Sequence, residues 1–140
     1  MRYESDKLTR LLSEQNAALR LLRELAAIPL EQFAIDPHKV ASAKYNFVVA
    51  IEATIDIVNH LIRKNGYRVP EDYADTFRVL TENGLFPYEF GERLANMARF
   101  RNRLVHLYWA VDVAQLHKIL REELGDFNLF RQYLAKAIGE

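Results

Sequence analysis

The stretch FVVAIEATIDIVNHLI, residues 47–62, decides which fold class the sequence predicts. Its apolar side chains recur at spacings of three and four residues, which is typical of an amphipathic helix. Upstream, Asp36 stands before Pro37, so a capping carboxylate is followed by a proline at the first helical position. Downstream, Asn65–Gly66 is a suitable C-terminal cap. The sequence therefore predicts one long helix between these two signals.

The same periodicity continues on both sides of this helix, and the few glycines and prolines fall between the periodic stretches. A proline ends the first stretch at Pro29, and Gly125 is expected to bend or split the last one. Because the connections are short, neighbouring helices should be antiparallel. We expect an all-α, up-and-down bundle of four main helices plus one short helix, in a single domain over residues 1–140. Four of the expected helices cover about residues 8–28, 37–65, 71–83 and 111–138. A further helix is expected to begin near residue 87 and to continue into the segment 97–111.

Composition narrows the classes of function. The chain has 19 basic and 19 acidic side chains, so no net charge draws it to nucleic acid or to an anionic membrane. It has no cysteine, which excludes disulfides, a thiolate nucleophile and cysteine-based metal sites. No apolar run approaches the length that spans a bilayer, and neither His38 nor His117 has metal-ligand spacing. We expect a cytoplasmic protein with no membrane contact, no metal and no cofactor.

Polar residues interrupt the apolar pattern in MARFRNRLVHLYWAV, residues 97–111. Arg101 occupies a position of the apolar seam that otherwise includes Leu94, Leu104 and Tyr108. Burying an unpaired guanidinium is costly, so Arg101 needs an anion or a polar cavity. One candidate for the counter-charge is Asp56 in the long helix. The alternative is that Asp56 pairs with His60, four residues later, on a solvated flank.

A second, basic face of this helix carries Arg99, Asn102, Arg103 and His106. Asn102 lies one turn before His106, where it could donate or accept a hydrogen bond and fix the histidine tautomer. Arg99 and Arg103 could contact phosphates, although ordinary exposed arginines would look the same. Arg101 and His106 are five residues apart, so about 140° separates them around a regular helix. A helix irregularity, a helix end or a second copy of the chain is needed to bring them together.

An arginine and a histidine suffice in principle to cleave RNA. Histidine exchanges protons near neutral pH, and arginine can hold a phosphate and stabilise the charge of the transition state. The ribose 2′-hydroxyl supplies the nucleophile, so this chemistry requires no metal.

The residues RNRLVHLY, 101–108, fit the pattern of an arginine, four residues, a histidine, one residue and a tyrosine. In this pattern, and in the neighbouring stretches IEATIDIVNHLI and PEDYADTFRVLTENG, the sequence resembles minimal HEPN-domain proteins, the HepT-like toxins. The resemblance covers nearly the whole chain.

This resemblance implies a HEPN-like homodimer that acts as the RNA endonuclease toxin of a type VII toxin–antitoxin pair. It implies a metal-independent enzyme that leaves a cyclic phosphate and has Arg101 and His106 as catalytic residues in a cleft between the two copies. It also implies an MntA-like nucleotidyltransferase antitoxin that transfers AMP from ATP to Tyr108.

Two other functions remain open from the sequence. One is a non-catalytic HEPN module that uses the same residues to bind a nucleotide or the partner nucleotidyltransferase. The other is a purely structural dimerisation domain.

Overall fold

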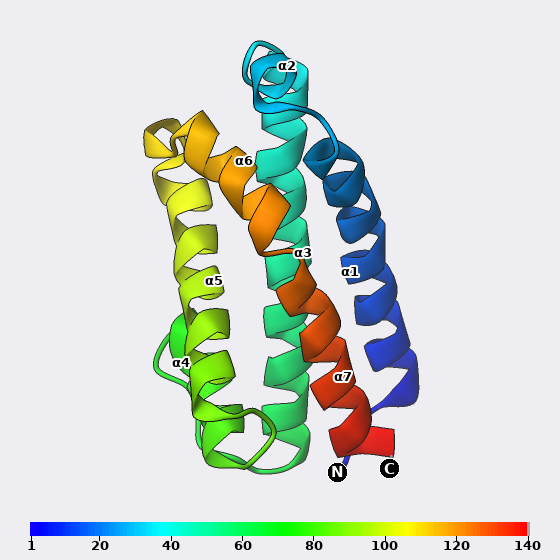
Figure 1. Ribbon diagram of the computed structural model, residues 1–140. Coiled ribbons are helices and arrows are strands. Elements are labelled where there is room, and N and C mark those ends of the chain that lie inside the picture. Colours follow the sequence, from blue (N-terminus) through cyan, green and yellow to red (C-terminus); the bar gives the residue numbers. More distant parts are fainter. Residues whose placement is uncertain (140) are drawn as a thin grey trace.

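The computed structural model describes residues 1–139, which form an elongated bundle of helices with no strand (Figure 1). The helices are α1 (Ser5–Ala26), α2 (Leu30–Ala34), α3 (Pro37–Lys64), α4 (Tyr73–Glu82), α5 (Tyr88–His106), the 3₁₀ turn η1 (Tyr108–Ala110), α6 (Val113–Glu122) and α7 (Gly125–Gly139). The predicted all-α fold is therefore confirmed.

Two features differ from the sequence-based expectation, and one expected feature is present. A short α2 stands between the first two long helices, where no helix was expected. The helix through the segment 97–111 stops at His106, because Leu107 leaves the helical region with φ −137° and ψ 39°. As expected, the last stretch is split near Gly125: it divides at Glu123–Leu124, and Gly125 becomes the first residue of α7.

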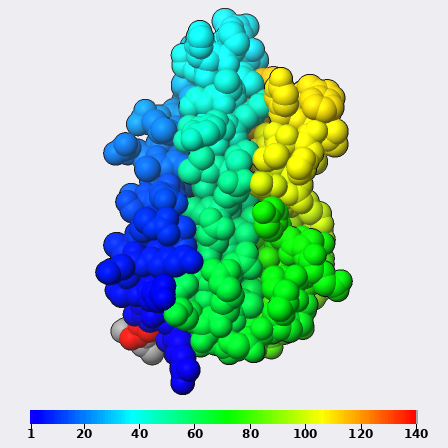
Figure 2. Space-filling view, turned by 180° about the vertical axis from the view of Figure 1, so that it is seen from behind, coloured from blue at the N-terminus to red at the C-terminus, as the bar shows by residue number. Residues whose placement is uncertain are grey.

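The long helix α3 is the centre of the bundle, and α1 and α5 lie along its two sides (Figure 1). On the front face, α6 crosses the bundle obliquely and α7 continues downwards between α1 and α5 (Figure 1). On the opposite face, α4 packs against α5 and α3 (Figure 2). The back face above α4 is thus formed by α3 and the C-terminal half of α5.

The ends of α3 follow the predicted capping signals. The Asp36 carboxylate accepts hydrogen bonds from the backbone N–H groups of His38 and Lys39, at 3.0 and 3.2 Å. After the helix, Gly66 adopts a left-handed conformation with φ +65°, which glycine tolerates without strain.

By length and composition the α3 helix could cross a membrane, but in this fold its apolar side chains are mostly buried inside the protein. Ile51, Ile55, Ile57, Val58 and Leu61 are all buried among the neighbouring helices. These residues form the centre of the protein core, and burial against other helices accounts for their hydropathy.

Candidate functional site

Arg101 lies on α5 at the edge of the core, and three side chains hold its guanidinium group. Nε and Nη2 donate to the same carboxylate oxygen of Glu52 on α3, at 2.9 and 2.5 Å, and Nη1 donates to Oδ1 of Asn102 at 3.0 Å. The guanidinium carbon lies over the ring of Tyr73, the first residue of α4, 4.9 Å from its centroid. Only 13% of the Arg101 side chain is exposed, whereas 42% of Glu52 is. The charge pair is therefore buried on the arginine side and open to solvent on the carboxylate side.

The expectation that Asp56 neutralises Arg101 is wrong, because Glu52, one helical turn earlier, does so. Asp56 lies at the surface of α3, and partial burial by its neighbours raises the pKa of its carboxyl, with repulsion from Glu52 and Glu14 adding to the effect.

The alternative pairing of Asp56 with His60 is also wrong. His60 is buried, and its Nε2 accepts a hydrogen bond from the backbone N–H of Glu4 at 2.9 Å. Burial lowers the pKa of His60, and repulsion from Lys7 adds to this effect. A histidine that accepts through Nε2 is neutral. His60 therefore holds the N-terminal segment against α3 by this hydrogen bond, and it does not contact the Arg101 site.

His106 is the last residue of α5 and is exposed to solvent. Contrary to the sequence-based expectation, no hydrogen bond joins Asn102 to His106 among residues 1–139, and the Asn102 side-chain oxygen accepts from Arg101 instead. The helix is regular between Arg101 and His106, so the two side chains leave it in different directions. The sequence left three ways to bring them together: a helix irregularity, a helix end or a second copy of the chain. The helix has no irregularity here, and it ends only after His106, so neither feature turns the two side chains toward each other. A second copy of the chain is the way that remains.

Tyr108 lies beyond the helix end, in η1, and no longer follows the seam of Arg101 as the sequence suggested. The residue is 57% exposed. Lys44 of α3 fixes this residue from the side, since its ammonium donates to the Tyr108 carbonyl oxygen at 3.0 Å and lies 5.3 Å from the centre of the phenol ring. The structure thus presents the phenol at the surface, beside the end of α5.

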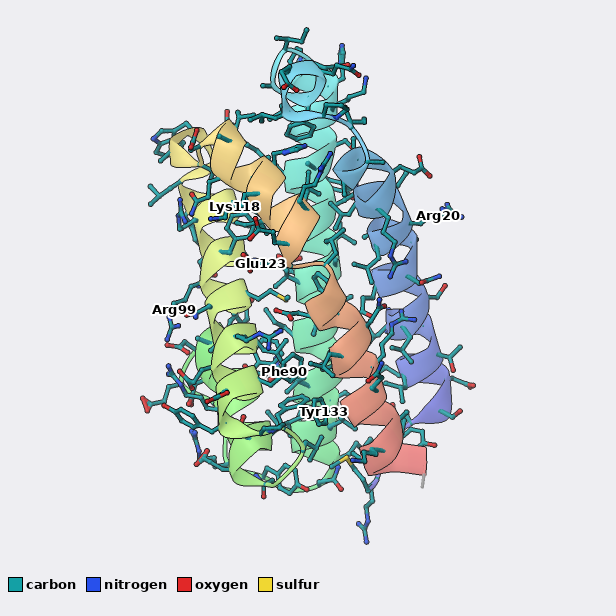
Figure 3. The ribbon with its side chains drawn as sticks, in the orientation of Figure 1. Arg20, Phe90, Arg99, Lys118, Glu123 and Tyr133 are labelled. Atoms are coloured by element: carbon teal, nitrogen blue, oxygen red, sulfur yellow. The ribbon has the colours of Figure 1, made fainter. Side chains whose placement is uncertain are left out.

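Arg99 and Arg103 line a separate pocket between α5, α6 and α7. Arg99 projects away from the bundle (Figure 3) and donates to Asn96, and Arg103 donates to Gln115 at 3.2 Å. About 160° separates each of them from Arg101 around a regular helix, so the two arginines lie on the far side of α5 from that guanidinium.

The sequence alone did not reveal the roles of three residues, Glu52, Tyr73 and Lys44. Glu52 had one signal, namely its place one turn from Asp56 on the same polar flank. Tyr73 and Lys44 gave no such signal, because each acts on a helix distant in sequence. Among residues 1–139, no group of three or more His, Asp or Glu side chains is placed to hold a metal ion.

The family model for HepT-like ribonucleases matches residues 15–134 of the chain. This chain belongs to the HepT-like ribonuclease family. A curated relative is the mRNA nuclease HepT of Shewanella oneidensis, which is 30% identical over 99 residues, 71% of this chain and 74% of that protein.

Solved structures share the fold over almost the whole chain. One is a tri-AMPylated Shewanella oneidensis HEPN toxin in complex with an MNT antitoxin, with a TM-score of 0.87 and 23% identity, covering 95% of this chain and 99% of that chain. Another is the Bacillus subtilis cytosolic protein YutE, whose function is unknown, with a TM-score of 0.80 and 19% identity, covering 99% and 95% of the two chains. At this level of identity the likeness establishes the HEPN fold.

Proposed function

We propose that this protein is the endoribonuclease toxin of a toxin–antitoxin pair and acts as a homodimer with Arg101 and His106 as its catalytic residues. The observation that carries the proposal is a mostly buried guanidinium, held by Glu52 and Asn102, five residues before an exposed histidine at a helix end. Membership of the HepT-like ribonuclease family supports the same activity.

In this mechanism the 2′-oxygen of a ribose attacks the adjacent phosphorus while the bond to the 5′-oxygen of the next nucleotide breaks. His106 exchanges protons with these oxygens, and Arg101 stabilises the negative charge on the phosphate. The product ends in a 2′,3′-cyclic phosphate, and no step needs a metal. Asn102 keeps the guanidinium oriented, and Asp56 has no part in the mechanism.

A dimer would bring an arginine and a histidine together, which one copy of the chain does not do. Arg101 and His106 diverge around α5, whereas a two-fold axis beside this helix would place the arginine of one copy near the histidine of the other. Arg99 and Arg103, on the far side of α5 from Arg101, would meet RNA only outside that cleft.

The test is cleavage of a labelled RNA by the wild-type protein and by His106→Ala, both in the presence of a metal chelator. We expect the wild type to cut and to leave a cyclic phosphate, and the variant to lose at least about a hundredfold in rate, the usual contribution of general acid–base catalysis. His38→Ala is the matched control, because His38 is also exposed near a helix end. A wild type that never cuts RNA would favour the non-catalytic binding module instead.

Control of the toxin by a nucleotidyltransferase antitoxin is the second half of the proposal. The exposed phenol of Tyr108 would accept AMP from ATP, which adds bulk and negative charge beside the RNA site. The relatives solved as toxin–antitoxin complexes, one of them AMPylated, support this regulation. Incubation with ATP and the partner enzyme should modify the wild type but leave Tyr108→Phe unmodified. The control Tyr88→Phe, which replaces a tyrosine even more exposed than Tyr108, should be modified like the wild type.

A further inference from the structure

An apolar groove lies beside Tyr108, between the N-terminal half of α3 and the end of α5. Its volume is about 560 Å³. Figure 2 shows the two walls from behind, with α3 in cyan and the end of α5 with the residues that follow it in yellow. The walls are aliphatic except for the aromatic rings and one cation, and they include Val40, Ala41, Val48, Leu104 and Val113.

The single cation among the groove-lining residues is Lys44. Its ammonium lies 5.3 Å from the centre of the Tyr108 ring and donates to the Tyr108 carbonyl oxygen. Among the ion pairs of the described residues 1–139, none includes Lys44. A positive charge without a carboxylate partner therefore stands beside a phenol that opens into an apolar groove.

This arrangement matches the two parts of an adenylyl group. The phosphodiester carries one negative charge and is stabilised by a nearby ammonium. The adenine ring is flat and largely apolar on its faces, so it prefers an aliphatic or aromatic groove to water. Once adenylylated, a phenol on the wall of the groove would carry both the phosphodiester and the adenine ring.

We propose that the groove between α3 and the end of α5 receives the adenosine of adenylylated Tyr108, while Lys44 pairs with the new phosphodiester. This inference rests on the proposed regulation. It adds the position that the adenylyl group occupies on the protein after its transfer to Tyr108. In the transfer, the Tyr108 oxygen bonds to the α-phosphorus of ATP, the bond to the β-phosphate breaks, pyrophosphate leaves with the electron pair, and the phenolic proton passes to water.

The docked adenylyl group would be protected from solvent. It would cover the surface next to His106 and hold the toxin in its inactive state without the antitoxin remaining bound. A free, flexible adenylyl group would leave this surface open part of the time.

The experiment measures how fast a phosphodiesterase removes AMP from the adenylylated full-length protein, followed by intact mass. Lys44→Gln removes the cation, and Ala41→Phe fills the groove from an exposed helix position. We expect both variants to release AMP faster than the wild type, and Lys44→Gln by about threefold to fivefold, the size expected of an exposed ion pair. The matched controls are Lys64→Gln at the other end of α3 and Ala17→Phe on the exposed face of α1, which should release AMP at the wild-type rate.

Release rates that are equal in the wild type and in both test variants would overturn this inference alone. A wild type that accepts no AMP at all would overturn the proposed regulation, and this inference with it. If Ala41→Phe splits the unmodified protein into monomers, the groove is a contact between copies of the chain, and the adenylyl site is wrong.

Discussion

Glu52 neutralises Arg101 in the free protein, and this pair is testable by itself. Replacing Glu52 by Gln leaves a guanidinium that is 13% exposed with no carboxylate. We expect Glu52→Gln to lower the free energy of unfolding by about 1–3 kcal/mol, the usual cost of breaking a charged hydrogen bond in a partly buried site. Urea denaturation at neutral pH measures the change.

Asp56→Asn is the control for this substitution, because it removes the same charge one turn further along α3. Asp56 makes no ion pair, and its raised pKa shows that its negative charge is disfavoured where it stands. Its free energy of unfolding should therefore change by less than about 0.5 kcal/mol. If Asp56→Asn destabilised the protein as much as Glu52→Gln, the structural assignment of the Arg101 partner would be contradicted.

At the scale of the elements, Gly91 decides how closely α4 and α5 approach. A Cβ atom at Gly91 would overlap Oγ1 of Thr81 on α4, which donates to the carbonyl of Phe77 at 2.9 Å. Alanine is the better helix former by about 1 kcal/mol, but overpacking costs about 1–3 kcal/mol. We expect Gly91→Ala to lower the free energy of unfolding of the wild type.

The same substitution in a Thr81→Ala background should have the opposite sign. Removing the Thr81 hydroxyl removes the atom that overlaps and leaves a contact of 3.2 Å with the Cβ atom of residue 81, so the helix propensity of alanine becomes the larger effect. Thermal unfolding of the two single variants and the double variant measures this reversal. If Gly91→Ala is equally destabilising in both backgrounds, close packing of α4 on α5 is not the cause.

The N-terminal segment is joined to α3 through neutral His60, which makes this junction sensitive to pH. The pKa of His60 is lowered in the folded protein, so the unfolded chain binds the proton more readily. The stability from this contact is fully present above the unfolded pKa of about 6.5 and is lost as the pH falls through the folded value. We expect the Glu4 amide, which donates to His60, to lose protection from hydrogen exchange, after correction for the intrinsic rate, as the pH falls below the unfolded pKa of about 6.5.

His60→Gln keeps an acceptor for this amide but cannot take up the proton. Its exchange rate, corrected for the intrinsic effect of pH, should stay constant over the same range. A pH dependence equal to that of the wild type would show that another group controls the junction.

The sequence predicted the long helices because periodicity and caps are local signals, and Asp36 and Gly66 act as their residue types suggested. The sequence could not identify the partner of Arg101. Glu52 and Asp56 are one turn apart on α3, and only the way α3 packs against α5 decides which of them meets Arg101. The end of α5 after His106 was missed for a similar reason. No proline or glycine marks it, and Lys44 holds the next turn from a distant helix.

For the whole molecule, the proposed catalytic pair, Arg101 and His106, is the feature that one chain does not complete. Arg101 is held inward against Glu52, whereas His106 is exposed at the helix end. The net charge is zero, so RNA has no general attraction to the surface and must be bound locally. These facts favour a composite site with the arginine of one copy and the histidine of the other.

Mixing two inactive variants tests this arrangement. Arg101→Ala and His106→Ala should each be inactive alone, and refolding them together should give heterodimers in which one of the two composite sites has both residues intact. Random pairing makes half of the dimers mixed, so about a quarter of wild-type cleavage should return if the two-fold arrangement holds. If the mixture stays inactive although mixed dimers form, Arg101 and His106 act within the same copy, and the end of α5 must rearrange when RNA binds.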